Sequence, residues 1–444
     1  MSGPNSTPVR IGIIGLGTVG GGTVNVLQRN AQEIARRAGR EITITQASAR
    51  DLNKPRICNT DGIALTSNPH DVVNNPDIDV VVELIGGDTL ARELVMSAIE
   101  QGKHVVTANK ALIAKHGNEI FDAAQKKGVM VAFEAAVAGG IPIIKAIREG
   151  LAGNRIDWVA GIINGTGNFI LTEMRDKGRS FEDVLKEAQE LGYAEADPTF
   201  DVEGIDAAHK LTILAAIAFG IPLQFEKAST EGISAITTED VGYAEQLGYR
   251  IKHLGIARRT EEGIELRVHP TLIPSKRLIA NVDGVMNAVL VKADAVGPTL
   301  YYGAGAGAEA TASAVVADLV DVVRTLTSDP ENRVPHLAFQ PGALADTAIL
   351  PMDEVKTAYY LKMRAQDKPG VLADITQILG NANISIEAVI QKEPSDEATH
   401  ATIIMLTHLV KEKAMNQAIA QIESLSSTEG KVTRIRVEQL NKDD

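Results

Sequence analysis

VRIGIIGLGTVGGGTVNVLQRN, residues 9–30, is the segment of the chain that is most informative about its fold. Its first part is mostly apolar and β-branched, which predicts a buried strand, and the glycine-rich turn after it leads into a helix. The glycines fall as GxGxxG: the first permits a tight turn, the second lets the backbone approach a pyrophosphate, and the third allows close helix–strand packing. A purely structural turn is the alternative. The context predicts a dinucleotide site formed by Gly15, Gly17, Thr18, Val19 and Gly20.

The end of the second predicted strand, residues 41–49, bears on the choice of cofactor. Arg50 follows this strand directly, with Lys54 and Arg56 close behind it. NADP requires a cation for its extra phosphate, whereas NAD-binding folds often place an acid there for the ribose hydroxyl. Arg50 therefore favours NADP(H), while Asp51 beside it leaves NAD(H) open. A solvated basic loop without a ligand is the remaining alternative.

Two further predicted strands end in residues suited to a ligand. IDVVVELIGG, residues 78–87, is continuously apolar, as strands of a parallel sheet are, and ends in Gly86 and Gly87. A cofactor could pass over this glycine pair. The strand at residues 104–107 is followed closely by Lys110. Because ligands of open α/β sheets bind at the carboxyl ends of the strands, Lys110 is a candidate site residue.

The pattern of elements predicts an α/β protein with several domains. We expect a Rossmann-type parallel sheet over residues 9–150 and an α+β domain over 151–327, whose last segment, 303–327, packs back on the first domain. Residues 328–356 contain four prolines and little periodicity, which indicates a linker. Residues 357–440 show the order βαββαβ of a ferredoxin-like unit. That unit has no paired acids, nucleophile or metal spacing, so it is interpreted as a regulatory or binding module.

The most polar candidate stretch is LGYAEADPTFDVEGIDAAHK, residues 191–210, which runs into an uncharged helix. Asp206 and Lys210 are four residues apart, so they share one helical face where the helix leaves solvent. A lysine at such a place can hold a proton donor against a polar substrate. Two alternatives stay open. Asp197 or Asp201 could simply cap the helix. Asp206 and Lys210 could be an ordinary surface ion pair that contributes about 0.3–0.5 kcal/mol to stability.

Two loops are weaker candidates. VMVAFEAAVAGGIPII, residues 129–144, predicts a strand followed by Glu134 and a glycine-rich loop, whose carbonyls could hold a hard cation. The residues alone favour a plain turn. NGTGN, residues 164–168, predicts a loop between strand and helix whose backbone N–H groups could bind small anionic or carbonyl ligands.

Composition excludes several functional classes. The 444 residues are 44% hydrophobic and 23% charged, with a net charge of −13 and no basic stripe, so nucleic acid is not expected as a partner. The single cysteine, Cys58, excludes an internal disulfide and a cysteine metal cluster. Neither a signal peptide nor an apolar run near the roughly 20 residues of a membrane span is present. We therefore expect a cytoplasmic protein without membrane contact.

The chain after its first eight residues resembles the bacterial homoserine dehydrogenases of the long form, which carry a C-terminal ACT domain. The resemblance implies reversible NAD(P)H-dependent reduction of L-aspartate 4-semialdehyde to L-homoserine, in threonine, methionine and isoleucine biosynthesis. It also implies that residues 151–327 serve catalysis and dimerisation, in a homodimer or homotetramer. The segments that carry it are GLGTVGGG, ELIGG, TANKALIAKHG, EAAVAGGIPII, NGTGNFIL, LGYAEADPTFDVEGIDAAHK and, for the ACT domain, DKPGVLADIT.

The resemblance also implies roles for single residues. Lys210 would give a proton to the developing alkoxide, and a desolvated lysine suits that task at neutral pH. The implied catalytic residues are Lys210, Lys110 and Asp206. The implied substrate-binding residues are Glu195, Asp201, Asp206 and Lys110. Along the cofactor, the resemblance adds Lys110, Gly192 and Gly305. A sodium ion would be held by the backbone around Glu134, Val137, Gly139 and Ile141.

The resemblance further implies that the ACT domain senses an end product, and we expect this to be L-threonine, bound near residues 367–372 and 383–386. Two other functional classes stay open. A different NADP-dependent reductase of a small oxo-acid would share the sheet but not the substrate. A non-catalytic amino-acid sensor would keep the nucleotide site, although it would not need Lys110, Glu195, Asp206 and Lys210 together.

Overall fold

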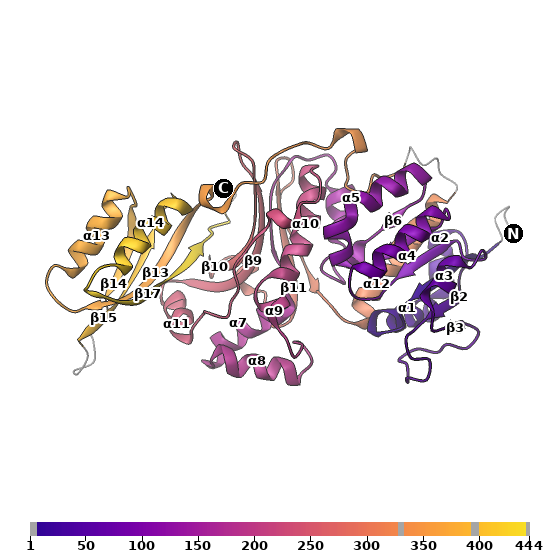
Figure 1. Ribbon diagram of the computed structural model, residues 1–444, viewed down its shortest axis with the longest axis horizontal. Helices are drawn as coiled ribbons and strands as arrows, with labels where there is room; N and C mark the ends of the chain where they lie inside the picture. Colours follow the sequence, from indigo (N-terminus) through magenta and orange to yellow (C-terminus); the bar gives the residue numbers. More distant parts are fainter. Residues whose placement is uncertain (1–6, 327–332, 392–398, 441–444) are drawn as a thin grey trace. The chain divides into compact units, whose positions relative to one another are not determined.

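The computed structural model of the protein describes residues 7–326, 333–391 and 399–440 (Figure 1). The described chain forms two compact units, and each unit is assembled from three separate stretches of sequence. The first unit comprises Met1–Gly165, Asp206–Glu226 and Val285–Thr347, and the second comprises Thr166–Ile205, Lys227–Gly284 and Ala348–Asp444. None of the helices in the described ranges is long and apolar enough to cross a membrane.

A six-stranded parallel sheet forms the centre of the first unit. Its strand order, β3-β2-β1-β4-β5-β6, is that of a doubly wound dinucleotide-binding fold, with the order reversing between β1 and β4. The predicted Rossmann-type sheet is thus confirmed. Its strands are β1 (Val9–Ile14), β2 (Ile42–Ser48), β3 (Ala64–Thr66), β4 (Val80–Glu83), β5 (His104–Thr107) and β6 (Val131–Ala132).

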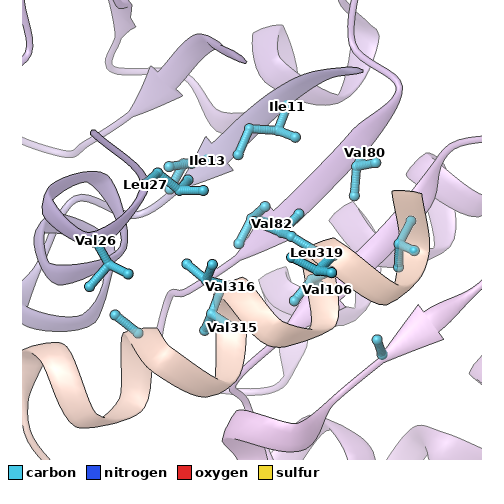
Figure 2. Packing of buried hydrophobic residues seen from close by; sticks show 14 of the residues in the cluster. Ile11, Ile13, Val26, Leu27, Val80, Val82, Val106, Val315, Val316 and Leu319 are labelled. Carbon is cyan, nitrogen blue, oxygen red and sulfur yellow. The ribbon is translucent and has the colours of Figure 1, made fainter. Parts of the chain in front are cut away.

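Helices cover this sheet, and one of them comes from much later in the chain. Figure 2 shows Val315, Val316 and Leu319 of α12 packed among apolar side chains of the sheet and of α1. A Cβ atom on Gly22 of α1 would lie 2.3 Å from the Ala308 carbonyl oxygen, so only glycine allows the two helices this close. The helices are α1 (Thr18–Arg29), α2 (Ala31–Ala38), α3 (Pro69–Asn74), α4 (Thr89–Glu100), α5 (Lys110–Lys127) and α12 (Ala308–Thr325).

The first unit also contains the buried helix α10 (Ile205–Phe219) and an antiparallel strand group. Every α10 residue from Leu211 to Phe219 is buried, as the uncharged sequence predicts. Gly220 ends the helix in the left-handed conformation, at φ +64°. The strands are β7 (Ile156–Ile162), β11 (Met286–Ala293) and β12 (Gly297–Ala304), and α6 (Ile143–Lys145) precedes them.

The second unit begins with α7, and here one expectation is wrong. Residues 165–168, predicted as a loop, form the first turn of α7 because Asn168 is fixed by bonds to the Val282 and Gly284 carbonyls. The long antiparallel pair of β9 and β10 follows, with β10 buried throughout. The elements are α7 (Gly165–Lys177), α8 (Phe181–Glu190), α9 (Thr199–Val202), β8 (Ser229–Thr230), α11 (Thr238–Gln246), β9 (Tyr249–Arg259) and β10 (Ile264–Pro274).

The C-terminal part of the second unit has the predicted βαββαβ order, with strands arranged β17-β13-β15-β14. The ferredoxin-like prediction is confirmed. Strand β17 also pairs in parallel with β10, through Thr271 and Arg436. Residue 327 and residues 328–332 of the expected linker lie outside the described ranges. The elements are β13 (Lys356–Gln366), α13 (Val371–Asn381), β14 (Ile386–Gln391), β15 (His400–Thr407), β16 (Val410–Lys411), α14 (Glu412–Glu423) and β17 (Thr428–Val437).

Candidate active site

The glycine-rich turn after β1 has the backbone shape that its sequence predicts. Gly15 adopts φ +103°, which L-residues with a side chain rarely reach. A Cβ atom on Gly20 would lie 2.0 Å from the Gly15 carbonyl oxygen, so the third glycine is needed for the turn to close. A Cβ atom on Gly17 would have no described atom within 4 Å. The N-terminus of α1, where Thr18 and Val19 lie, therefore borders open space that suits a phosphate group.

A second glycine turn, after β4, lies beside the first. A Cβ atom on Gly15 would come within 2.8 Å of the Leu84 carbonyl oxygen, so the two turns touch. Gly87 adopts φ +83°, and Cβ atoms on Gly86 and Gly87 would have no described neighbour within 4 Å. Both turns sit at the carboxyl edge of the sheet and leave room for a ligand.

The loop after β2 presents cations toward the first turn. Arg50 is exposed, and the Arg56 guanidinium donates to the carbonyls of Leu16, at 3.3 Å, and Asp51, at 2.6 Å. The Asp51 carboxylate accepts from the Asn53 N–H at 2.9 Å and so stabilises its own loop. Arg56, which sequence reasoning gave only a supporting part, thus contacts the glycine turn directly.

Lys110, Asp206 and Lys210 meet in the first unit. The Lys110 Nζ lies 3.0 Å from Asp206 Oδ1, and the Lys210 Nζ lies 2.7 Å from Asp206 Oδ2. The Asn164 amide donates to the same Oδ2 at 2.9 Å, and the Lys210 ammonium donates to the Ile163 carbonyl at 2.7 Å. Helices α5 and α10 and the end of β7 thereby bring together residues from three distant parts of the sequence.

The burial of this cluster excludes the surface-pair alternative. The side chains of Asp206 and Lys210 are only 5% and 12% exposed, whereas that of Lys110 is 34% exposed. Burial by itself disfavours the charged form of Asp206. Lys210, Lys110 and the Asn164 amide outweigh that effect and hold the Asp206 pKa well below its ordinary value. Asp206 is therefore an ionised carboxylate at neutral pH, and it orients two ammonium groups.

The other expected substrate residues belong to the second unit. Glu195 is exposed, and its carbonyl accepts from the Gln189 amide at 3.1 Å. Asp201 lies in α9, and Gly192 adopts φ +76° just after α8. Asp197 accepts from the Thr199 N–H at 3.1 Å, a contact at the start of α9 and not of α10, the helix that the capping alternative concerned.

The loop expected to hold sodium packs on the Gly305 turn. A Cβ atom on Gly139 would lie 2.4 Å from the Gly305 carbonyl oxygen, and Ala138 and Gly139 both have positive φ, at +54° and +46°. The Val137 N–H bonds the Glu134 carbonyl at 3.3 Å, and the Ile141 N–H bonds that of Ala138 at 2.9 Å. The loop is thus a compact turn, with strain at Ala138, whose side chain makes a positive φ unfavourable.

The Glu134 carboxylate and N–H group are hydrogen-bonded to residues outside this loop. Its carboxylate accepts from the N–H groups of Ile144 and Lys145, each at 2.9 Å, and its own N–H donates to Asp318 at 2.7 Å. Burial and the neighbouring Asp318 raise the Glu134 pKa to about 7. The described residues contain no group of three or more His, Cys, Asp or Glu side chains that could hold a metal. A cation in this loop would therefore rest on backbone carbonyls.

Sequence reasoning missed several residues that build the site. Asn164 was noted only as part of a loop motif, yet it is a direct partner of Asp206. Glu83 and Thr107 end β4 and β5, are fully buried, and share a hydrogen bond of 2.6 Å. The signal that could have found them is a polar residue at the end of an otherwise apolar parallel strand.

Comparison with known proteins agrees with this architecture. Family models match residues 15–134 as the NAD-binding domain of homoserine dehydrogenase, residues 142–320 as homoserine dehydrogenase and residues 359–427 as an ACT domain. The chain is 70% identical to homoserine dehydrogenase of Pseudomonas aeruginosa, over 98% of this chain and all of the relative. It is 60% identical to the enzyme of Neisseria gonorrhoeae, over 98% of this chain and 99% of the relative.

Solved structures lead to the same family. A crystal structure of a homoserine dehydrogenase from Thiobacillus denitrificans matches with a TM-score of 0.93 and 70% identity, over 98% of this chain and 99% of that chain. A hyperthermophilic archaeal homoserine dehydrogenase in complex with NADPH matches with a TM-score of 0.61 and 26% identity, over 71% of this chain and 98% of that chain. With a nicotinamide-binding sheet, a catalytic domain and an ACT domain, this chain belongs to the homoserine dehydrogenase family of oxidoreductases.

Proposed function

We propose that the protein catalyses the reversible reduction of L-aspartate 4-semialdehyde to L-homoserine, with Lys210 as proton donor and acceptor. The observation that carries the proposal is the buried Asp206 carboxylate with an ammonium group on each oxygen, Lys210 at 2.7 Å and Lys110 at 3.0 Å. Such a cluster offers a polar substrate one charged group for binding and another for proton transfer.

The chemistry divides simply between cofactor and protein. When bound, the nicotinamide supplies a hydride to the aldehyde carbon, or accepts one from the alcohol carbon. Lys210 gives a proton from Nζ to the carbonyl oxygen, so that an N–H bond breaks while an O–H bond forms. In the reverse direction the neutral amine takes the hydroxyl proton. Asp206 accepts a hydrogen bond from the Lys210 ammonium at 2.7 Å and so holds it in place.

Substrate binding is assigned to further charged side chains. Lys110, the more exposed lysine, holds the substrate oxygen and borders the cofactor. Glu195 and Asp206 hold the ammonium and hydroxyl region of the substrate, and Asp201 supports them. Gly192 and Gly305 line the cofactor. These roles follow from the family resemblance and from the charge that each residue carries.

For the cofactor we propose NADP(H), with NAD(H) as a weaker alternative. The glycine turn fits a pyrophosphate, since the backbone of Gly17 borders open space. Exposed Arg50 and the Arg56 side chain at Leu16 place positive charge where a 2′-phosphate would lie. The archaeal relative whose structure is in complex with NADPH supports this choice. The loop at Ala138 and Gly139 suits a sodium ion bound by the backbone around Glu134, Val137, Gly139 and Ile141.

For regulation we propose that the ACT domain binds L-threonine in a homodimeric or homotetrameric cytoplasmic enzyme. Two features support the expected effector segments. Gly370 adopts φ +95° at the start of α13, and Asn383 adopts φ +59° before β14. Such turns bring backbone groups into position to bind a small zwitterion. The Asp367 carboxylate accepts from the Gln391 amide at 3.3 Å, which links the first segment to β14.

The test measures NADPH oxidation with L-aspartate 4-semialdehyde and with other small oxo-acids, each with and without threonine. We expect turnover with the semialdehyde alone, strongly reduced in Lys110→Ala. Lys115→Ala is the matched control, because Lys115 lies on the same helix and pairs with Asp88 at 3.0 Å. Turnover of another oxo-acid instead of the semialdehyde would support a different reductase. Tight NADPH binding without any turnover would support a sensor.

A further inference from the structure

Glu83 is a carboxylate buried at the carboxyl end of β4, among apolar strand residues. Its side chain is fully removed from solvent. One carboxylate oxygen accepts from the Ile85 N–H at 2.8 Å, and the other accepts from the Thr107 hydroxyl at 2.6 Å. Both oxygens are thus held by donors on two neighbouring strand ends, β4 and β5.

Thr107 connects the Glu83 carboxylate to Asn109. The Thr107 hydroxyl oxygen accepts from the Asn109 N–H at 3.0 Å. The Asn109 amide donates to the carbonyls of Gly87, at 2.6 Å, and Ile85, at 3.3 Å. Its carbonyl oxygen caps α5 by accepting from the Leu112 N–H at 3.0 Å. Asn109 is therefore fixed on every polar group of its side chain and at its own N–H.

Lys110 is the next residue and the first of α5. Because Asn109 caps this helix, its position sets the direction in which the Lys110 side chain leaves the backbone. The Lys110 ammonium then reaches Asp206 at 3.0 Å. A chain of hydrogen bonds thus runs from the Glu83 carboxylate through the Thr107 hydroxyl to Asn109, and the peptide bond joins Asn109 to Lys110.

Burying a carboxylate between two strands is energetically unfavourable. Burial raises the Glu83 pKa to about 7, although Thr107, Ile85 and Asn109 favour the charged form. Apolar residues at this position would pack the two strands without that cost. Groups of this kind cluster at functional sites, and this one lies at the edge where the cofactor is expected.

We infer that Glu83 is a positioning residue, which fixes Lys110 in the active site through Thr107 and Asn109. The inference rests on the proposed role of Lys110. The same network holds the carbonyls of Ile85 and Gly87, so it also keeps the second glycine turn and the start of α5 in one arrangement. It acts on geometry and takes no part in proton transfer.

The test compares Thr107→Val, which removes the hydroxyl at nearly constant volume, with Thr107→Ser, which keeps it. Both are combined with Lys110→Ala, and Glu83→Gln is measured alongside. At saturating NADPH we expect Thr107→Val to lower kcat/KM for the semialdehyde about 10- to 100-fold, as a displaced catalytic group does. Thr107→Ser should stay within about threefold. In the Lys110→Ala background Thr107→Val should add little, because both changes remove one interaction.

Four results would contradict the positioning role of Glu83. Normal kcat/KM in Thr107→Val and Glu83→Gln, with only a lower melting temperature, would mean that the network is merely structural. Equal losses with and without Lys110 would mean that Thr107 acts independently of it, and a Ser variant as poor as the Val variant would exclude the hydroxyl. Lys110→Ala at the wild-type rate would overturn the proposed role of Lys110 and this inference with it.

Discussion

The Lys210 ammonium lies 2.7 Å from the Asp206 carboxylate, one turn earlier on α10, and both side chains are almost completely shielded from solvent. The helix that follows is apolar on nearly every side, so this pair is the polar end of an otherwise hydrophobic element. A buried ion pair of this kind contributes little net stability compared with apolar packing, but it holds charge in a defined direction. Its value therefore lies in chemistry.

The first prediction concerns Asp206→Asn, which keeps the shape of the side chain and removes its charge. Two ammonium groups would lose their counter-ion, so we expect kcat to fall about 100-fold or more. Breaking a buried pair should also destabilise the fold by about 3–5 kcal/mol. Steady-state kinetics and thermal unfolding of the same preparation check both effects. Full activity in the Asn variant would show that the charge of Asp206 is not needed.

The second prediction contrasts two glycines of the same turn. Gly20→Ala should disrupt folding of the first unit, because its Cβ atom would lie 2.0 Å from the Gly15 carbonyl oxygen. Gly17→Ala should fold normally, since its Cβ atom would have no described atom within 4 Å. It should nevertheless weaken NADPH binding about tenfold or more, because the methyl group would occupy the phosphate space. Melting temperature and NADPH fluorescence titration separate these effects. Unchanged NADPH affinity in Gly17→Ala would exclude the site.

The third prediction concerns cofactor preference. Arg50→Ala should raise the KM for NADPH about 10- to 100-fold and leave that for NADH nearly unchanged, because only NADPH carries the 2′-phosphate. Lys126→Ala is a suitable control, since Lys126 is an exposed cation paired with Asp122 on α5. An equal increase in KM for NADPH and for NADH would mean that Arg50 does not bind the 2′-phosphate.

The fourth prediction concerns pH and Glu134. Its folded-state pKa of about 7 lies above its ordinary value of 4.5, so the folded protein holds this proton more tightly than the unfolded chain does. The stability from this group is complete below about pH 4.5 and is lost as the pH rises through 7. Compared with Glu134→Gln, the wild type should lose about 3 kcal/mol of unfolding free energy between these limits. If the unfolding free energies of the two proteins changed in parallel with pH, the raised pKa of Glu134 would be contradicted.

The sequence alone was sufficient to predict the parallel sheet and the βαββαβ unit, because both consist of strongly apolar strands that alternate with helices. It did not reveal β9, whose charged residues argue against a buried strand. The structure accommodates them in ion pairs, such as Lys252 with Asp283 at 3.0 Å and Arg258 with Glu438 at 3.0 Å. It also missed β12, where Pro298 and the flanking glycines weigh against a strand.

The same limit applies to the site. Asp206 and Lys210 could be paired from their spacing, since four residues make one helical turn. Asn164 could not, because it reaches Asp206 across 42 residues of sequence, and Glu83 meets Thr107 across 24. Contacts of this kind arise only when strand ends and helix starts come together in the folded chain.

The most direct measurement is the rate of hydride transfer from NADPH to L-aspartate 4-semialdehyde in a single turnover, for wild type and Lys210→Ala. NADPH affinity is measured in the same samples. We predict that the variant binds NADPH as the wild type does but transfers hydride at least about 100-fold more slowly, because the carbonyl oxygen lacks its proton donor. Hydride transfer at the wild-type rate in Lys210→Ala would contradict the role of Lys210 as proton donor.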